Sequence, residues 1–319
     1  MHGARAGDVL AGKALALGAI GVIALAPALV SLAAAAASAP SEAASAALIG
    51  GAYAAYLAIW ILVVVAVSAL ARSSRGALLG LIAVWAVAVV FVPRGAAALA
   101  ARAEPAPTRV EMDLRLAQDA RRIGDSHNPD DPFFAAFRER TLAAYGVERV
   151  EDLPVNFRGL VAAEGEALTS RLFADYAKRT ADQQRAQSAW LEAGAVLSPA
   201  LAVRQASMAG AATDLENHVR FLEQAEAYRF NLVQRLNRLH AQDVRAEDDA
   251  ARSRDLDAEQ RTRVSAENWA AMPDFHFRSA TAEERVSGML SGLVVLVGWL
   301  LAAIALFIFS GRRLREAAR

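Results

Sequence analysis

Four stretches of the chain contain no Asp, Glu, Lys or Arg and consist almost entirely of apolar residues: 14–41, 43–71, 76–93 and 286–311. A helix needs about 20 apolar residues to cross the hydrocarbon core of a bilayer, so each stretch with its flanks can span a membrane. The segment between the third and fourth stretches is polar. The hydrophobic pattern therefore predicts an all-α membrane protein with four transmembrane helices and a mostly helical domain inserted between the third and the fourth.

The ends of these stretches set the predicted domain boundaries. Residues 1–102 form a membrane domain whose three helices cover about 14–38, 46–71 and 76–101. Residues 103–280 form the inserted domain, and residues 281–319 hold the fourth helix and a basic tail. Thr281-Ala282-Glu283-Glu284 has the form of a capping box and marks the start of the fourth helix.

The inserted domain has the periodicity of helices. After Thr213, a predicted N-cap, apolar or small residues recur every three or four positions up to Leu239. Ser198-Pro199 predicts a second helix start, with Pro at the first helical position. No run alternates strictly enough to predict a strand. Further helices are predicted over these ranges: 110–123, 132–145 and 164–193.

The average composition conceals two different regions. The whole chain is 55% hydrophobic and has no net charge, but residues 103–285 contain 24 Lys and Arg against 31 Asp and Glu. An acidic domain with scattered Arg lacks the basic patch that nucleic-acid binding requires, so no nucleic-acid partner is expected. The absence of Cys excludes disulfides and thiolate metal sites.

Basic residues near the predicted spans indicate the orientation of the chain. Cytoplasmic loops hold the excess of Lys and Arg, and the loop near Pro40 has none. Both termini are therefore expected in the cytoplasm, and residues 103–280 outside it. Three groups of basic residues carry this prediction: Arg5 and Lys13, Arg72 and Arg75, and the tail residues Arg312, Arg313, Arg315 and Arg319.

The N-terminus also allows a second interpretation, a cleavable signal peptide. Basic residues, an apolar stretch and Ala37-Ser38-Ala39 imitate its three regions. The apolar stretch is longer than the roughly 7–15 residues of a signal peptide, and Pro40 directly after the site is expected to hinder cleavage. A transmembrane helix is the favoured interpretation.

Several motifs give the chain a resemblance to a known family. Residues 152–159, Asp-Leu-Pro-Val-Asn-Phe-Arg-Gly, and residues 197–201, Leu-Ser-Pro-Ala-Leu, resemble signatures of bacterial ABC-2-type transporter permeases with a large extracytoplasmic domain. This branch is similar to the permease of nitrous oxide reductase maturation. Matching positions extend over essentially the whole chain, and the ones that carry the resemblance are Asp152, Pro154, Asn156, Phe157, Gly159, Ser198, Pro199, Asp214, Glu226 and Arg229.

The resemblance implies the permease subunit of a transporter in a bacterial inner membrane, driven by a separate ATPase subunit. A homodimer or a heteromeric permease is expected, because four spans are too few to enclose a pathway. Members of the family have a further span upstream, so the chain resembles a form that is short at its N-terminus. The substrate and the direction of transport do not follow from the resemblance.

Two sets of residues are candidates for roles in transport. Arg94 is a charge within a long apolar stretch and Pro93 precedes it, which suggests gating or domain docking. Simple anchoring at the outer membrane interface is the alternative for Arg94. Lys13, Arg72 and Arg75 are candidates for contact with the ATPase, and the alternative is that they only fix topology.

The chain shows no sign of its own catalytic site. It contains no phosphate-binding loop of the G-x-x-x-x-G-K-[ST] form, no G-x-S-x-G elbow and no histidine pair at metal-ligand spacing. No catalytic, cofactor-binding or metal-ligating residue is therefore assigned. The alternative to a permease is a membrane-anchored extracytoplasmic scaffold or binding module without transport activity.

Three aromatic residues before the fourth span fit either a membrane interface or a domain core: Trp269, Phe275 and Phe277.

Overall fold

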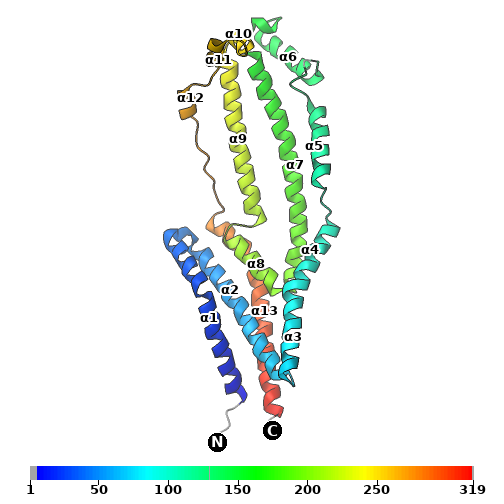
Figure 1. Cartoon of the computed structure of the whole chain (residues 1–319), viewed down its shortest axis with the longest axis vertical. Coiled ribbons are helices and arrows are strands. Elements are labelled where there is room, and N and C mark those ends of the chain that lie inside the picture. Colours follow the sequence, from blue (N-terminus) through cyan, green and yellow to red (C-terminus); the bar gives the residue numbers. More distant parts are fainter. Residues whose placement is uncertain (1–5, 129, 318–319) are drawn as a thin grey trace. The chain divides into compact units, whose positions relative to one another are not determined.

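The protein is built from helices. The structure, a computed structural model, describes residues 6–128 and 130–317, and every regular element within them is a helix (Figure 1). The all-α class predicted from the hydrophobic pattern is confirmed for this part of the chain.

Four of the helices are long and apolar enough to cross a membrane. They cover Gly7–Ser38, Pro40–Leu70, Ser74–Ala103 and Ala282–Glu316. The first is α1 (Ala6–Ser38), the second combines the short η1 (Pro40–Glu42) with α2 (Ala43–Leu70), and the fourth is α13 (Ala282–Ala317). The third consists of three consecutive elements: α3 (Ser74–Ala86), the π-helical η2 (Val87–Phe91) and α4 (Val92–Ala103). The four predicted spans are present, each longer than its charge-free core.

The chain divides into two compact units. The span unit contains the four apolar helices up to Pro105 and from Ser279 onward, together with Gln184–His218. The insert unit contains Ala106–Gln183 and Val219–Arg278. The sequence-based division had placed all of 103–280 in one inserted domain. Gln184–His218 instead groups with the apolar helices, because its central helix buries an apolar face against two of them.

The ends of the span unit alternate as four spans require. The start of α1, the turn between α2 and α3 and the end of α13 lie at one end of this unit (Figure 1). At the opposite end, Glu42 follows α1 and forms an ion pair with Arg285 at the start of α13, with 3.1 Å between Oε1 and Nη1. The end with the start of α1 therefore also carries the basic residues of the α2–α3 turn and of the end of α13. Which end faces the cytoplasm remains a prediction.

The capping box predicted for the fourth span is present. The Thr281 backbone N–H donates to the Glu284 carboxylate, and the Glu284 N–H donates to the Thr281 hydroxyl. These two bonds satisfy donors that the first turn of a helix otherwise leaves without partners. The start of α13 is therefore defined by its own sequence.

The insert unit contains the remaining helices. Two of them match their predicted ranges closely, α5 (Arg109–Ile123) and α6 (Pro132–Tyr145). Two long helices are shared with the span unit. α7 (Phe157–Ala195) begins in the insert unit and ends in the span unit, and α9 (Leu215–Asp243) begins in the span unit and ends in the insert unit. The other elements are short: η3 (Val150–Asp152), α10 (Ala246–Ala251), α11 (Leu256–Arg261) and α12 (Ala266–Ala270).

Within the insert unit, α7 and α9 lie side by side and antiparallel (Figure 1). The Gln234 side chain donates to the Ala163 carbonyl at 2.8 Å, and the Ser170 hydroxyl donates to Glu226 at 3.2 Å. Positions further along α7 thus meet positions earlier in α9. This pairing forms the frame of the unit.

Two predicted helix starts are wrong. We expected a helix from residue 164, but α7 begins at Phe157, because Asn156 caps it by accepting the Arg158 N–H through Oδ1. We also expected Thr213 to cap the helix that follows it. Asp214 takes this role by accepting the Asn217 N–H at 2.9 Å, and α9 begins one residue later.

An aromatic cluster lies in the insert unit. Phe221 of α9 makes edge contacts with Phe275 and Phe277, at 6.0 and 5.4 Å between ring centroids. Phe221 and Phe277 are 42% and 41% exposed, so the cluster lies at the surface of the unit and confirms neither the membrane-interface nor the domain-core interpretation. Trp269 is 52% exposed and takes no part in this cluster.

Candidate functional site

The most unusual part of the span unit is the segment Ala195–Gly210, which we call the α8 segment. It contains the turn after α7 and the helix α8 (Pro199–Gly210). Ser198 caps α8 by accepting the Leu201 N–H, and Pro199 occupies the first turn, where its missing N–H has no cost. Both residues are fully buried, and the helix start predicted from this pair is confirmed.

Ser198 compensates for a disturbance in the third span. In η2, the Val92 N–H donates to the Val87 carbonyl, five residues earlier. The next donor in this pattern would be Pro93, which has no N–H to give to the Ala88 carbonyl. The Ser198 hydroxyl donates to that carbonyl instead, at 2.5 Å. A motif residue of the α8 segment thereby satisfies the backbone group that Pro93 leaves without a partner.

A second hydrogen bond holds the same turn to the fourth span. The Trp299 indole N–H donates to the Val196 carbonyl at 3.1 Å. Trp299 is the middle residue of the span Ala282–Glu316, and Ala88 lies at the middle of Ser74–Ala103. The turn between α7 and α8 therefore reaches the midpoints of two membrane-spanning helices. Such re-entrant backbone is tolerated at membrane depth only where its polar groups have partners, and these two bonds provide them.

Small residues let α8 approach α13 closely. A Cβ atom at Gly292 would lie 2.7 Å from the Ala202 carbonyl oxygen, and one at Gly288 would lie 3.2 Å from the Ala209 Cβ. Gly288 and Gly292 form a GxxxG pair on α13, and Ala202 and Ala206 have the same spacing on α8. In lipid, close packing of such faces is a main source of helix association.

The α8 segment is consequently part of the core of the span unit. Gly210 at its end leaves room for Met289 of α13 and Ile49 of α2. The buried residues of this core come from α2, the α8 segment and α13: Ala52, Ile59, Ala195, Leu201, Ala202, Val203, Ala206, Leu296 and Ala303.

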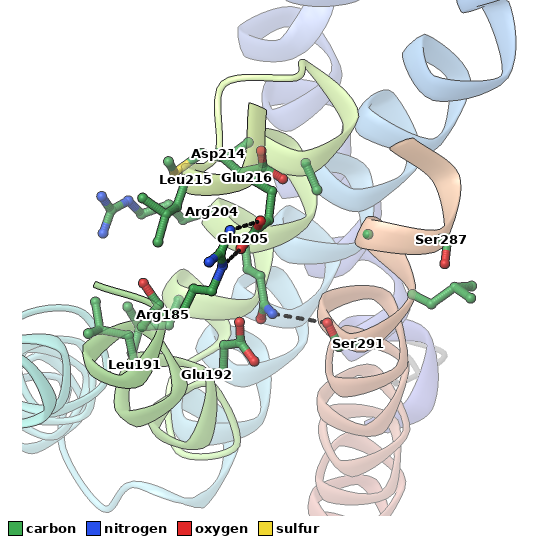
Figure 2. A pocket seen from close by; sticks show the side chains of 16 residues that line it. Arg185, Leu191, Glu192, Arg204, Gln205, Asp214, Leu215, Glu216, Ser287 and Ser291 are labelled. Atoms are coloured by element: carbon green, nitrogen blue, oxygen red, sulfur yellow. Dashed lines mark hydrogen bonds and ion pairs between the residues drawn. The ribbon is translucent and has the colours of Figure 1, made fainter. Parts of the chain in front are cut away.

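A cleft of about 740 Å³ lies beside α8 within the span unit (Figure 2). Its apolar lining includes Leu201 and Leu290. Its polar lining comes from α7, α8, α13 and the start of α9. These polar lining residues are Arg185, Ser188, Glu192, Arg204, Gln205, Asp214, Glu216, Ser287 and Ser291.

Two polar contacts organise the cleft (Figure 2). Arg185 donates to both carboxylate oxygens of Glu216, at 2.7 and 2.9 Å. Gln205 donates to the Ser291 hydroxyl at 2.9 Å and so connects α8 with α13. Arg204 is exposed and points outward at the rim, and neither it nor Glu192 has an ion-pair partner among the described residues.

The structure relates the gating candidate Pro93 to the motif residue Ser198, which donates to the Ala88 carbonyl. The third span does not break at Pro93 but continues through it as α4. Arg94 is exposed and has no ion-pair partner among residues 6–128 and 130–317. Its role in gating or anchoring remains a prediction.

The three residues predicted to contact an ATPase are exposed. Lys13 lies in the early turns of α1. Arg72 and Arg75 lie at the turn between α2 and α3, where Ser73 caps α3 by accepting the Gly76 N–H. All three lie toward the same end of the span unit (Figure 1). Their exposure at one end of the unit fits a common surface.

The motif 152–159 has a structural role in the insert unit. The Asn156 backbone N–H donates to the Ala241 carbonyl at 2.7 Å, and its side chain donates to the buried carboxylate of Asp249. Gly159 packs directly against the backbone of Ala241, where no Cβ would fit. The motif thus fixes the start of α7 to the end of α9.

Asp249 is the buried charge of this arrangement, at 2% exposure. Burial alone would raise the pKa of its carboxyl. Hydrogen bonds from His240 and Asn156, together with the charge of Arg252, outweigh that effect and lower the pKa below its ordinary value. The group is therefore ionised at neutral pH and holds three segments together.

A second polar network joins α7 and α9 near their middles. Arg229 forms ion pairs with Glu226 and Glu166, at 2.7 and 2.6 Å. The hydrogen bond from Arg229 lowers the pKa of Glu226, although partial burial opposes this, and both carboxylates raise the pKa of Arg229. Two motif residues, Glu226 and Arg229, are thus structural.

The remaining motif residues do not converge on a site. Phe157 stacks on Phe137 at 6.1 Å between centroids, and Asp152 forms a surface ion pair with Arg149. Pro154 is exposed, whereas Asp214 both caps α9 and lines the cleft. The described residues contain no group of three or more His, Asp or Glu side chains placed to hold a metal ion.

Sequence reasoning did not identify the contact between α8 and α13. The Gly288–Gly292 spacing was a signal for it, as was the Ala202–Ala206 spacing. Trp299 was also overlooked, because a single Trp within a span is usually read as a lipid-facing residue rather than as a donor to a re-entrant turn.

Comparison with protein-family models identifies a domain in this chain. Residues 109–278 match the model described as Domain of unknown function (DUF3526). This range includes the insert unit from α5 onward and the α8 segment. Comparison with curated proteins and with solved structures finds no match.

Proposed function

The chain belongs to the DUF3526 family, and we propose that it is the membrane-spanning permease subunit of an ABC-2-type transporter that works with a separate ATPase subunit. The resemblance of the motifs at 152–159 and 197–201 to such permeases supports this proposal. Four helices long and apolar enough to span a membrane also support it, since a permease subunit is a multi-pass membrane protein.

The observation that carries the proposal is the re-entrant α8 segment. Ser198 and Trp299 connect its turn to the middles of the third and fourth spans. A permease must move polar groups within its membrane core when it changes conformation. A backbone turn held there by two exchangeable hydrogen bonds is a suitable moving part.

Incomplete burial of the spans supports an assembly of more than one subunit. At most 17% of any apolar span window is buried within the chain. Val196 and Leu197 at the re-entrant turn are more than 60% exposed. A second permease copy or a different permease subunit would cover such surfaces and enclose a pathway.

The ATPase contact belongs to the end of the span unit that carries Lys13, Arg72 and Arg75. A short turn between α2 and α3 transmits movement well because it joins two spans directly. In the proposed complex, ATP binding and hydrolysis by the partner would move this turn and, through α2 and the third span, the α8 segment.

Co-purification with an ATPase tests the proposal. The full chain would be expressed with ATPase subunits of its own bacterium, isolated from membranes and reconstituted, and ATP hydrolysis would be compared with and without it. We expect a stable complex with an altered hydrolysis rate. If no ATPase is retained, even after chemical cross-linking, the scaffold or binding-module alternative would replace the permease.

Charge reversal at the predicted contact refines the test. Replacing Arg72 and Arg75 with Glu should abolish retention of the ATPase. Arg102→Glu is the matched control, since Arg102 is exposed in the last turn of the same span at its other end. If both variants lose the ATPase equally, the cause is impaired membrane insertion, and the predicted contact at Arg72 and Arg75 is wrong.

A further inference from the structure

The cleft beside α8 has the properties of a binding site for an amphiphile. Its apolar lining includes Leu191 and Leu201, with Leu290 of α13. Its polar lining includes charged groups and the hydroxyls of Ser188 and Ser291. A cavity lined by both kinds of side chain accommodates a molecule that has a polar end and hydrocarbon chains.

The position of the cleft along α13 indicates that such a molecule comes from the bilayer. Ser287 and Ser291 lie within the first two turns of the charge-free run 286–311, so the cleft lies where this span enters the membrane. This depth corresponds to the boundary between headgroups and acyl chains. Leu290 and Val294 on the same stretch of α13 are more than half exposed, which leaves the apolar side open to lipid.

Charges in the cleft select the headgroup. Arg185 and Glu216 neutralise each other through their two hydrogen bonds. Among the described lining residues, Arg204 remains as a cation at the rim and Glu192 as a carboxylate on α7, while Asp214 already accepts hydrogen bonds from Asn217. A site with one cation and one carboxylate outside any ion pair suits a ligand that carries both a phosphate and an ammonium group.

We propose that this cleft binds a zwitterionic phospholipid with a primary amine in its headgroup. Arg204 holds the phosphate by charge-assisted hydrogen bonds, and Glu192 accepts hydrogen bonds from the ammonium group. The first methylenes of the acyl chains lie against Leu201 and Leu290. A volume of about 740 Å³ takes the headgroup and glycerol, with the rest of the chains in the bilayer. The proposal depends on the four spans and not on a transport activity.

Native mass spectrometry of the purified full chain tests the proposal. Phospholipids of equal chain length, with ethanolamine, choline or glycerol headgroups, would be added in parallel to protein in detergent. We expect the ethanolamine lipid to be retained most strongly. Choline cannot donate hydrogen bonds to Glu192, and the glycerol lipid is anionic and meets the net negative charge of the cleft. Equal retention of the three lipids, or preference for the anionic one, would overturn the proposal.

Three variants locate the binding. Arg204→Gln should weaken binding of the ethanolamine lipid about tenfold, since a charge-assisted contact with phosphate is lost. Glu192→Gln should remove the preference for ethanolamine over choline. Ser188→Trp should reduce binding of every lipid by filling the cleft while leaving its charges in place. Arg138→Gln is the control, because Arg138 is exposed on α6 of the insert unit.

Unchanged binding in Ser188→Trp, or equal losses in Arg204→Gln and Arg138→Gln, would contradict this location. Thermal unfolding of each variant in detergent distinguishes loss of binding from loss of folding. Soluble phosphoethanolamine serves as a separate competitor. If it binds as strongly as the ethanolamine phospholipid and with the same dependence on Arg204, the acyl chains contribute nothing, the site takes a small solute and the lipid proposal is wrong.

Discussion

The span unit and the insert unit are both helical, but different interactions hold them together. In the span unit, glycine and alanine faces let α8 and α13 pack closely, and single hydrogen bonds connect buried backbone groups. In the insert unit, α7 and α9 are joined by charged networks around Asp249 and Arg229 and by clusters of aromatic rings. The contrast follows from the solvent, because lipid gives no hydrophobic gain for burying apolar side chains and water does.

The α8 segment shows how the two solutions meet within one chain. It follows and precedes polar helices, yet its own buried face is made of Ala, Leu, Val and Gly. Ser198, the Val196 carbonyl and Gln205 of this segment each have a hydrogen-bond partner in the spans. The following predictions test whether close packing or polar networks dominate in each unit, beginning with the largest effect.

Gly292→Leu should cause the greatest loss. Its side chain would collide with the Ala202 carbonyl, a backbone atom that cannot move without displacing α8. We expect a destabilisation of about 3 kcal/mol or more. Thermal unfolding in detergent measures it, with Gly298→Leu as control, because a Cβ at Gly298 has no neighbour within 4 Å. Equal effects of the two substitutions would show that α8 does not pack on this face.

Asp249→Asn should destabilise the insert unit by about 2 kcal/mol, because His240 and Asn156 lose a buried ionised acceptor. Hydrogen exchange of peptides from the start of α7 and the end of α9 measures this in the full chain. Peptides of α13 provide the internal control, and faster exchange there would argue against a local effect.

Acid should reproduce the effect of that substitution. The pKa of Asp249 is lower in the folded chain than its ordinary value of 3.8, so folding favours the ionised form. Its stabilisation is present above this value and is lost as the pH falls from about 4 through the lower folded pKa. Exchange in the insert unit should accelerate over this range in the wild type and much less in Asp249→Asn. Identical acid profiles would contradict the assignment.

Ser198→Ala should destabilise the span unit by about 1 to 2 kcal/mol. The change removes both the cap of α8 and the hydrogen bond to the Ala88 carbonyl, which Pro93 has no N–H to replace. Thermal unfolding in detergent measures the loss. Ser31→Ala is a control within a span, since the Ser31 hydroxyl only bonds to its own helix.

Arg229→Gln should have the smallest effect, about 0.5 to 1 kcal/mol, since its side chain is 46% exposed and solvent screens the ion pairs. The loss should shrink as salt is raised, in contrast to that of Gly292→Leu. A salt-independent loss would show that packing of the side chain matters more than its charge.

Local features of the fold were accessible from the sequence. The helix starts at Pro199 and Ala282, and the helices α5 and α6, depend on caps and periodicity within a few residues. The membership of Gln184–His218 in the span unit was not accessible in this way. It depends on Ser198 meeting Ala88 and on Trp299 meeting Val196, contacts between residues about 100 positions apart.

The candidate site also combines residues that have a local sequence signal with contacts between distant residues that have none. Pro93 and Ser198 were selected as separate features, and only the structure shows that Ser198 donates to the Ala88 carbonyl, to which Pro93 has no N–H to give. Arg204 and Glu192 carry no local signal, because a charge on a helix is ordinarily a solvated one. The cleft exists only when α7, α8 and α13 are brought together.

Accessibility of the re-entrant turn tests the central claim most directly. The chain contains no Cys, so Leu197→Cys places a single thiol at the tip of the α8 segment. Leu256→Cys, at an exposed position of the insert unit, is the control. In membranes, a water-soluble maleimide should label residue 256 rapidly and residue 197 hardly at all, while a membrane-permeant reagent reaches both. Equal, rapid labelling of both thiols would place the α8 segment in water and contradict the account.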